Sequence, residues 1–171
     1  LVIGRMFSKE LAMPYHNLEW FEYMNTESRL QEGISLHQEG KLDQAELIYQ
    51  QILQVTPEND EVLNLLGLIA YQVGKYQIAT ELINQAIDMD SSQSPFFNNL
   101  GLVLQKQDRL GEAIQAYRQS LELNPNDADV YSNFGTALKE HGQLEEAIDS
   151  YNTAIEIQSD HKEVYYNLGI A

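Results

Sequence analysis

The chain has 171 residues, of which 26 are Asp or Glu and only 10 are Lys or Arg, so its formal net charge is -16 with histidine neutral. This acidic balance lacks the clustered cations that hold a phosphate backbone or an anionic lipid surface, so we expect neither nucleic acid nor a membrane as a partner. With no cysteine in the chain, disulfides, thiolate nucleophiles and cysteine-ligated metal centres are excluded.

The apolar residues are dispersed along the chain. They make up 43% of the sequence, as in an ordinary globular domain, and their uninterrupted runs are only a few residues long. A membrane-spanning helix needs about 20 apolar residues in a row, and the stretch from Leu1 to Arg5 does not begin a signal peptide. We therefore expect a cytoplasmic protein with a core of its own.

Residues 1–25 stand outside the pattern that organises the rest of the chain. Leu18, Phe21 and Met24 favour a short amphipathic helix after Asn17. Three interpretations stay open: a helix that packs on the following domain or frays from it, a flexible leader ahead of Met24, or a segment that binds a neighbouring copy of the chain. Limited proteolysis that spares these residues would exclude the flexible leader.

From residue 26 onward, the same residue types recur every 34 positions. Glycine and alanine each form a column, and a third column is mostly tyrosine. Several columns in one register define an internal repeat. The three columns are Gly33, Gly67, Gly101, Gly135 and Gly169; Ala45, Ala79, Ala113 and Ala147; and Tyr49, Ile83, Tyr117 and Tyr151.

Each repeat is predicted to be a hairpin of two helices. Apolar residues spaced three and four apart lie on one face of a helix, and the third repeat has two such stripes separated by Gln107, Asp108 and Arg109. Glycine at this break in the other repeats suits the left-handed turn after a helix, which Asp108 adopts less easily. The stripes are Phe97, Leu100, Gly101 and Leu104, then Leu110, Ala113, Ile114, Tyr117 and Leu121. The repeat units are 26–59, 60–93, 94–127 and 128–161, with a partial fifth unit at 162–171.

The small residues of the columns predict close packing between the two helices of a hairpin. Glycine inside a helix costs about 1 kcal/mol relative to alanine, so a column of five copies indicates that the second helix approaches closely there. The alanine column does the same from the other helix. We expect Tyr49, Tyr117 and Tyr151 to fill the space between neighbouring hairpins.

These columns resemble the tetratricopeptide repeat, whose pattern is W-x2-L-G-x2-Y, then A-x3-F and P, over 34 residues. In the third unit the matching residues are, in order, Phe97, Leu100, Gly101, Leu104, Ala113, Tyr117 and Pro125. The resemblance covers residues 26–171, with Glu32, Ser91 and Ser159 as departures. It implies an all-α, right-handed superhelical solenoid of helix–turn–helix hairpins whose concave face binds other proteins.

The last unit contains only part of its first helix. Leu168 and Ile170 would face a second helix that the chain does not contain, and nothing at this end is typical of a polar cap. We interpret the chain as part of a longer protein, with a natural monomer that has a frayed end as the rival interpretation. Open repeat ends also allow self-association, which light scattering over a concentration series would detect.

Chemical motifs are absent from the sequence. No phosphate loop, HExxH, nucleophile elbow or EF-hand occurs, so we expect no catalytic residues, no cofactor and no metal, and we interpret this segment as non-enzymatic. His37 and His141 are interpreted as surface residues because their separation is not a multiple of 34. Glu145, Glu146 and Asp149 form an acidic helix face that we expect to be solvated.

The first helix of each hairpin lines the groove in proteins of this family. On that pattern, the sixth position holds Asn99, Asn133 and Asn167, with Gln31 and Leu65 in the earlier units. The series resembles the asparagine ladder of O-linked N-acetylglucosamine transferases, in which amides bind the backbone of an extended polypeptide. An amide both donates and accepts, so it can pair with any peptide group. Surface asparagines and hydrogen bonds between repeats are the alternatives.

The resemblance implies a peptide-binding set on the first helices. Its lining is rich in amides and low in charge, so the acidic residues are expected to lie largely outside the groove. Capture of a free carboxylate is not expected, because the cations of the family's carboxylate clamp are missing and Asp129 replaces one of them. The predicted peptide-binding residues are Asn64, Asn98, Asn99, Leu102, Lys106, Asn133, Thr136, Tyr166 and Asn167.

The predicted function is therefore recognition of an extended polypeptide segment, by a scaffold without a reaction of its own. The alternative from another class is a substrate-docking arm of a glycosyltransferase-like enzyme whose catalytic domain follows Ala171. The reading frame beyond that residue discriminates between them.

Overall fold

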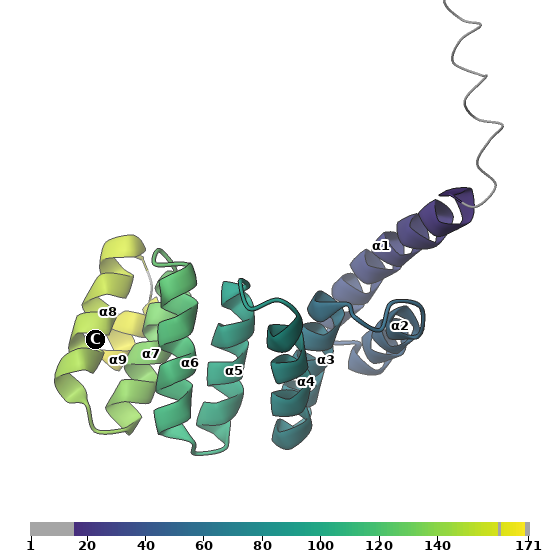
Figure 1. Ribbon diagram of the computed structural model, residues 1–171. Coiled ribbons are helices and arrows are strands. Elements are labelled where there is room, and N and C mark those ends of the chain that lie inside the picture. The colour runs from purple at the N-terminus through teal and green to yellow at the C-terminus, as the bar shows by residue number, and fades with distance from the viewer. Residues whose placement is uncertain (1–15, 161, 170–171) are drawn as a thin grey trace, which may run out of the picture. The chain divides into compact units, whose positions relative to one another are not determined.

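The computed structural model describes residues 16–160 and 162–169, and every regular element in them is an α-helix. The chain divides into two compact units, residues 1–57 and 58–171. The first contains α1 (His16–Gln38) and α2 (Leu42–Val55). In the second, seven helices follow in hairpin order, and consecutive helices stand side by side from α3 to α9 (Figure 1). They are α3 (Asp60–Gln72), α4 (Tyr76–Met89), α5 (Ser94–Lys106), α6 (Leu110–Leu123), α7 (Ala128–Glu140), α8 (Leu144–Ile157) and α9 (Lys162–Asn167). The predicted all-α architecture of hairpins is confirmed.

The first unit is a single hairpin with a long first helix. Helix α1 runs without a break from His16 to Gln38, so residues 16–25 belong to the same helix as the start of the first repeat. It pairs with α2, and the Arg29 guanidinium donates a hydrogen bond to the Gln51 side chain across the hairpin. Residues 1–15 of the predicted leader lie outside the described residues, as do the side chains of the stripe predicted from Leu18 to Met24.

The turn inside each hairpin has the geometry that its glycine predicts. Gly74 has a φ of +79°, and its N–H donates to the Tyr71 carbonyl while the N–H of Lys75 donates back to the Ala70 carbonyl. This pair of bonds is a Schellman motif, which ends a helix with one left-handed residue. Asp108 takes the same place in the third hairpin with a φ of 60°, so the turn predicted there is confirmed despite the missing glycine.

The glycine column lets the two helices of a hairpin touch. A Cβ added at Gly101 would lie 2.5 Å from Cε1 of Tyr117, and one added at Gly135 would lie 2.7 Å from the same atom of Tyr151. Real Cβ atoms do not approach other atoms so closely, so only glycine permits this approach. The tyrosine rings therefore pack on the glycine of their own hairpin, and Tyr117 and Tyr151 also belong to the core cluster that joins neighbouring hairpins.

Neighbouring hairpins of the second unit share one continuous core. Helix α6 packs on α7 and helix α4 on α5, and the alanine column is completely buried at Ala79 and Ala113. Buried residues from α5 to α9 form a single cluster, which Leu168 joins as a partly buried member. The hairpins therefore depend on their neighbours for burial, as stacked repeats do.

The final glycine of the column differs from the others. Gly169 was expected inside a helix, but α9 ends at Asn167 and Gly169 has a φ of +70°, with its N–H donating to the Tyr166 carbonyl.

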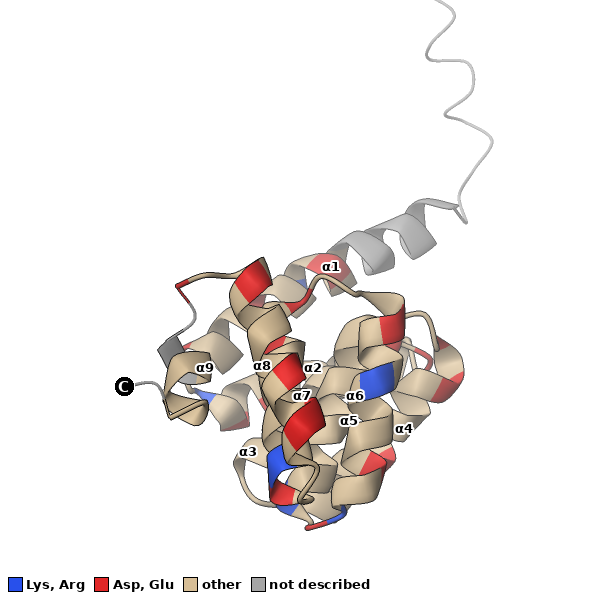
Figure 2. Cartoon of the chain, turned by 90° about the vertical axis from the view of Figure 1, so that its left-hand side faces the viewer, with Lys and Arg blue, Asp and Glu red and all other residues tan. Residues whose placement is uncertain are grey.

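The surface of the second unit is acidic where α8 faces outward. Glu145, Glu146 and Asp149 are all exposed, and Figure 2 shows acidic residues along this helix. The solvated acidic face expected from the sequence is therefore present. Among the helices of the described part, none is long and apolar enough to cross a membrane.

Candidate functional site

The first helices of the hairpins in the second unit are joined by a row of amide side chains. Helices α3, α5, α7 and α9 contact one another in this order. The Asn99 amide donates to Asn64 Oδ1 at 3.0 Å, and the Asn133 amide donates to Asn98 Oδ1 at 3.2 Å. The structure therefore brings four predicted site residues into two pairs that bridge successive repeats. These hydrogen bonds are one of the alternatives that the sequence left open for the ladder.

The last step of the row uses a hydroxyl as its acceptor. Asn167 donates to Thr136 Oγ1 at 3.4 Å, and that hydroxyl also contacts the Ser132 carbonyl and the Tyr151 hydroxyl. The spacing of the sixth position is thus preserved from α5 to α9, while the partner in the preceding repeat changes from an amide to a hydroxyl. We call Asn64, Asn98, Asn99, Asn133, Thr136 and Asn167 the amide row.

The bridging bonds leave hydrogen-bonding capacity in the amide row. A primary amide offers two N–H donors and a carbonyl with two lone pairs. Asn99 and Asn133 each use one N–H in the bridge, and neither Oδ1 accepts a bond from another described residue. Both side chains are partly exposed. Each of them can therefore still donate to a peptide carbonyl and accept from a peptide N–H.

The remaining predicted site residues lie on the same helices with different exposure. Leu102 is partly exposed on α5, and Lys106 is exposed at the end of that helix. Tyr166 on α9 is 77% exposed. Asn64, by contrast, is only 6% exposed, so it supports its neighbour and reaches solvent over little of its surface.

A second polar contact between first helices was not part of the predicted set. Gln105 on α5 donates to Glu140 Oε2 on α7 at 2.6 Å and accepts from the Tyr117 hydroxyl at 3.1 Å. Burial raises the pKa of Tyr117 well above its ordinary value, with smaller contributions from Tyr71 and Glu140. The phenol therefore stays neutral and donates. Gln105 is the twelfth residue of its repeat and Glu140 is the thirteenth residue of the next repeat. The two residues are therefore 35 positions apart, as Asn99 is from Asn64, and this spacing was the signal for the pair in the sequence.

A cleft opens beside the amide row at the start of α3 and α5. Its volume is about 510 Å³, and Asn64 lies in its wall. Asp90 accepts hydrogen bonds from Ser92 and from the Gln93 side chain, and these bonds lower its pKa below the usual value. Sequence reasoning missed this cleft, although acids at the first two positions of the unit were a signal for it. It is lined by Asp60, Glu61, Asn64, Leu65, Asp90, Gln93, Pro95 and Phe96.

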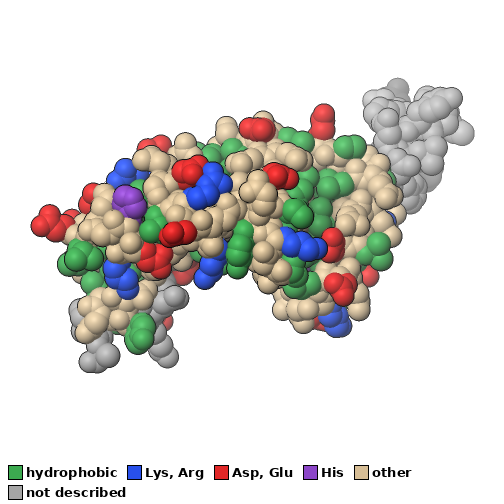
Figure 3. Space-filling view, turned by 90° about the horizontal axis from the view of Figure 1, so that it is seen from below, with side chains coloured by type: hydrophobic (Ala, Val, Ile, Leu, Met, Phe, Trp, Pro, Cys, Tyr) green, Lys and Arg blue, Asp and Glu red, His purple; other side chains and the backbone are tan. Residues whose placement is uncertain are grey.

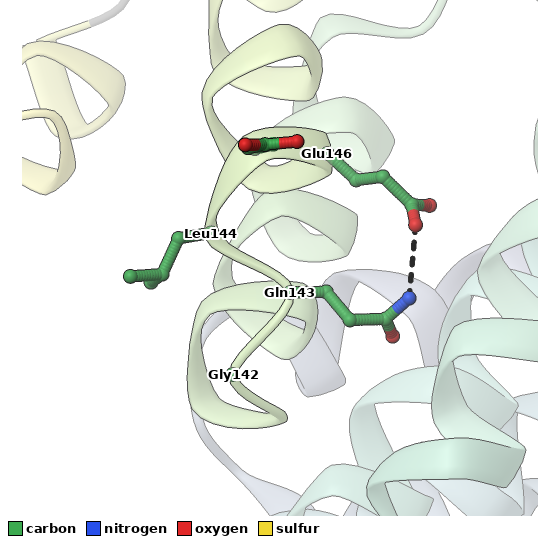
Figure 4. Close-up of a pocket in the computed structure, with 5 residues that line it drawn as sticks. Gly142, Gln143, Leu144 and Glu146 are labelled. Carbon is green, nitrogen blue, oxygen red and sulfur yellow. Dashed lines mark hydrogen bonds between the residues drawn. The ribbon is translucent and has the colours of Figure 1, made fainter.

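Another hollow, of about 380 Å³, lies at the turn between α7 and α8. All of its lining residues are consecutive, from Gly142 to Glu146, and Gln143 donates to Glu146 Oε1 at 2.9 Å. Leu144 points away from these two side chains (Figure 4). Because one turn supplies every wall, this hollow brings together no residues from different repeats.

The two edges of the second unit carry different charge. The edge with the turns inside hairpins has the cations Lys75, Lys106, Arg109 and Lys139, of which Arg109 pairs with Glu112. Figure 3 shows both signs of charge interspersed on this side. The opposite edge, with the loops between hairpins, has acidic residues and no Lys or Arg among the side chains that the structure describes. Its acidic residues are Glu58, Asp60, Glu61, Asp88, Asp90, Glu122, Asp127, Asp129, Glu156 and Asp160. The cleft therefore opens at the acidic edge.

Helical hairpins of constant length, packed glycine against tyrosine and bridged by amides, define a helical repeat protein of the 34-residue class. Comparison with family models gives the same result. Tetratricopeptide repeat models match residues 30–94 and residues 95–160. The chain belongs to the tetratricopeptide repeat family.

Solved structures of tetratricopeptide repeat proteins have a similar fold. A crystal structure of MamA is 25% identical, with 81% of this chain and 85% of that chain covered and a TM-score of 0.69. MamA from Desulfovibrio magneticus RS-1 is 17% identical, with 80% and 77% covered and a TM-score of 0.70. YrrB, described as a TPR protein with an unusual peptide-binding site, is 20% identical, with 80% and 71% covered and a TM-score of 0.71. A comparison with curated proteins finds no match.

Proposed function

We propose that the chain is a protein-interaction scaffold that binds an extended polypeptide segment along α3, α5, α7 and α9. The observation that carries the proposal is the amide row, in which Asn99 and Asn133 keep an unpaired carbonyl oxygen and a spare N–H at successive repeats. An extended peptide presents N–H and C=O groups that such amides can bind whatever its side chains are. The peptide-binding site in the description of YrrB, which shares the fold, is consistent with this use.

The bridges between asparagines support this function because they hold the amides in place. A flexible amide loses rotamer entropy when it binds, which costs about 0.5–1.5 kcal/mol for each immobilised side chain. Asn99 and Asn133 are already fixed by Asn64 and Asn98. A row fixed in advance binds a peptide at a lower entropic cost, so the contacts between repeats and peptide recognition are compatible.

The test begins with 12-residue peptides selected from a random display library on the intact chain. Synthetic copies are titrated by calorimetry against the wild type and against Asn99→Ala plus Asn133→Ala. Hydrogen bonds contribute about 1 kcal/mol each, so we expect the double variant to weaken binding roughly 10- to 100-fold with the helical circular dichroism unchanged at 25 °C. N-methylation of the peptide backbone is expected to weaken binding to the wild type as well.

A matched control removes two asparagines from second helices. Asn84 and Asn152 are exposed on α4 and α8, so Asn84→Ala plus Asn152→Ala is expected to leave the affinity unchanged. Equal affinity of both double variants for the selected peptides would contradict the proposed role of the amide row.

The docking-arm alternative rests on the same three asparagines and their resemblance to the ladder of O-linked N-acetylglucosamine transferases. Sequencing the gene beyond the codon for Ala171 tests it, because a glycosyltransferase domain has to follow in the same frame. Self-association and the cytoplasmic location belong to the scaffold proposal as expectations. Light scattering and fractionation of cells are the corresponding measurements.

A further inference from the structure

The cleft beside the amide row has the composition of a site for a charged amphipathic group. Asp60 and Asp90 face it from the start of α3 and from the loop that precedes α5, and Pro95 and Phe96 supply apolar surface. Its volume of about 510 Å³ falls within the range of ligand pockets. No Lys or Arg contributes to its lining.

The helix ends around the cleft reduce its negative charge without cancelling it. The N-termini of α3 and α5 both lie there, and each carries a partial positive charge of about one half. Together they amount to about one positive charge against the two carboxylates of Asp60 and Asp90. The N–H of Val62 in α3 is already bonded by the Asn59 side chain. A net negative field remains, so the cleft complements a cation.

Asn64 gives the cleft a second, independent feature. The residue is only 6% exposed, its Oδ1 accepts from Asn99, and its own amide hydrogens have no partner among the described residues. Since Asn64 lies in the wall of the cleft, these hydrogens are available to a carbonyl oxygen that enters it. An occupant with a main-chain carbonyl and a cationic side chain satisfies both features.

The carboxylates suit an organic cation better than a metal ion. No group of three or more His, Asp or Glu in the described chain has the arrangement of a metal site. Asp90 already accepts three hydrogen bonds, from the Ser92 N–H, the Ser92 hydroxyl and the Gln93 amide. A carboxylate has about four lone-pair sites, so one remains for an incoming N–H donor.

We propose that the cleft binds an arginine side chain of the peptide that lies along the amide row. The guanidinium pairs with Asp60 and Asp90, because its five donors in a planar fork can serve two carboxylates at once. The methylene groups contact Pro95 and Phe96, since a long cationic side chain places its stem on apolar surface. The amide of Asn64 donates to the main-chain carbonyl of the arginine.

This inference rests on the proposed function, because it assumes that a peptide lies along the amide row. The cleft itself can be tested with a small probe. N-acetyl-arginine amide carries the side chain and both flanking peptide groups, and N-acetyl-citrulline amide is its neutral isostere. Each is titrated into the full ¹⁵N-labelled chain while amide signals are recorded by NMR. We expect shifts at the Asn64 side-chain amide and at Gln93 with the arginine probe, and binding of the citrulline probe at least about tenfold weaker.

Substitutions in the cleft provide the matched comparison. Asp60→Asn plus Asp90→Asn removes two charges with little change in shape, and we expect it to weaken binding of N-acetyl-arginine amide about tenfold or more. Asp149→Asn plus Glu145→Gln removes two exposed charges on α8 and is expected to change binding less than twofold. Equal effects of the two double variants, or equal binding of arginine and citrulline probes, would overturn the proposal.

The same probes separate failure of the cleft from failure of the groove. Asn99→Ala plus Asn133→Ala is expected to leave binding of N-acetyl-arginine amide within about threefold of the wild type, because only the support of Asn64 is lost. If the probe binds in the cleft and no selected peptide binds the amide row, the proposed function is wrong and the cleft stands. If selected peptides bind and replacing their arginines by citrulline has no effect, the cleft assignment is wrong.

Discussion

The second and third hairpins have the same backbone arrangement but differ in the side chains that pack between their two helices. In the second, α3 packs Gly67 on Ile83, and the nearby residue of α4 is Ala86. In the third, α5 packs Gly101 on Tyr117, and Ser120 replaces the alanine. At these two positions of the second helix the second hairpin has apolar side chains, whereas the third has hydroxyl groups that need partners.

The polar interior of the third hairpin is satisfied by its own helices. Tyr117 donates to Gln105. Ser120 donates to the Ser94 carbonyl at 2.9 Å, and Ser94 donates to the Ser120 carbonyl at 3.1 Å. The comparison shows that the repeat specifies how closely the two helices approach, and that apolar or hydrogen-bonded side chains can both fill the remaining space.

The close approach itself gives the largest expected effect. Gly101→Ala places a Cβ within 2.8 Å of three atoms of a rigid aromatic ring, whereas at Gly67 only one atom, Cγ1 of Ile83, lies within 3.0 Å. Overpacking costs typically 1–3 kcal/mol. We expect Gly101→Ala to lose about 3 kcal/mol in urea denaturation and Gly67→Ala about half as much.

The control for both substitutions is Gly111→Ala. A Cβ at Gly111 in α6 meets nothing within 4 Å, so alanine there is expected to stabilise the helix by about 0.5–1 kcal/mol. A loss of stability for Gly111→Ala, or equal losses for Gly67→Ala and Gly101→Ala, would contradict the packing argument.

The phenol of Tyr117 makes the third hairpin sensitive to alkaline pH. Burial raises its pKa in the folded chain above the value of about 10 in the unfolded chain. The folded state therefore binds the proton more tightly, so this stabilisation is fully present below pH 10 and is lost as the pH rises towards the folded pKa. The expected slope is about 1.4 kcal/mol per pH unit above pH 10.

Comparison with Tyr117→Phe isolates this contribution. The variant loses the bond to Gln105, which costs about 1 kcal/mol at neutral pH, but its stability is expected to fall less steeply between pH 10 and 11. Denaturation curves at several pH values give both quantities. Parallel decline of wild type and variant would show that Tyr117 is not the group responsible.

Much of the hairpin fold could be predicted from the sequence because its causes are local and periodic. The glycine column, the turn at Asp108 and the helical stripes each depend on residues within one repeat. The pairing of Asn99 with Asn64 depends on the lateral offset between neighbouring helices, which a list of equivalent positions does not contain. The 34-residue spacing of the asparagines was therefore equally consistent with side chains that face solvent and with side chains that form hydrogen bonds between repeats.

The cleft could not be predicted for a related reason. Asp60 and Asp90 are 30 residues apart, and they approach only because the loop before α5 returns to the start of α3. The sequence therefore predicted the structure within a hairpin, but it did not predict features that depend on the loops between hairpins and on contacts with neighbouring repeats.

The paired serines provide a more moderate test of the third hairpin. Ser120 is fully buried, so Ser120→Ala removes its bond to the Ser94 carbonyl and is expected to cost about 1 kcal/mol. A double-mutant cycle with Ser94→Ala measures the coupling, which we expect to exceed about 0.5 kcal/mol. Ser91→Ala, at an exposed loop residue, is expected to stay within about 0.5 kcal/mol of wild type. Additive effects of the two serine substitutions would show that the hydroxyls act separately.

The turn at Asp108 gives the smallest expected effect, and the substitution there is expected to stabilise the protein. Its φ of 60° is left-handed, where the other hairpins have Gly40, Gly74 and Gly142. A side chain in this conformation costs about 1–2 kcal/mol, and Asp tolerates it better than most residues. Asp108→Gly relieves this strain but makes the unfolded chain more flexible, so the net gain is expected to be only about 0.5 kcal/mol in urea denaturation. The reverse change, Gly74→Asp, is expected to lose about 1 kcal/mol. A gain for Gly74→Asp would mean that the turn is held by contacts other than its backbone conformation.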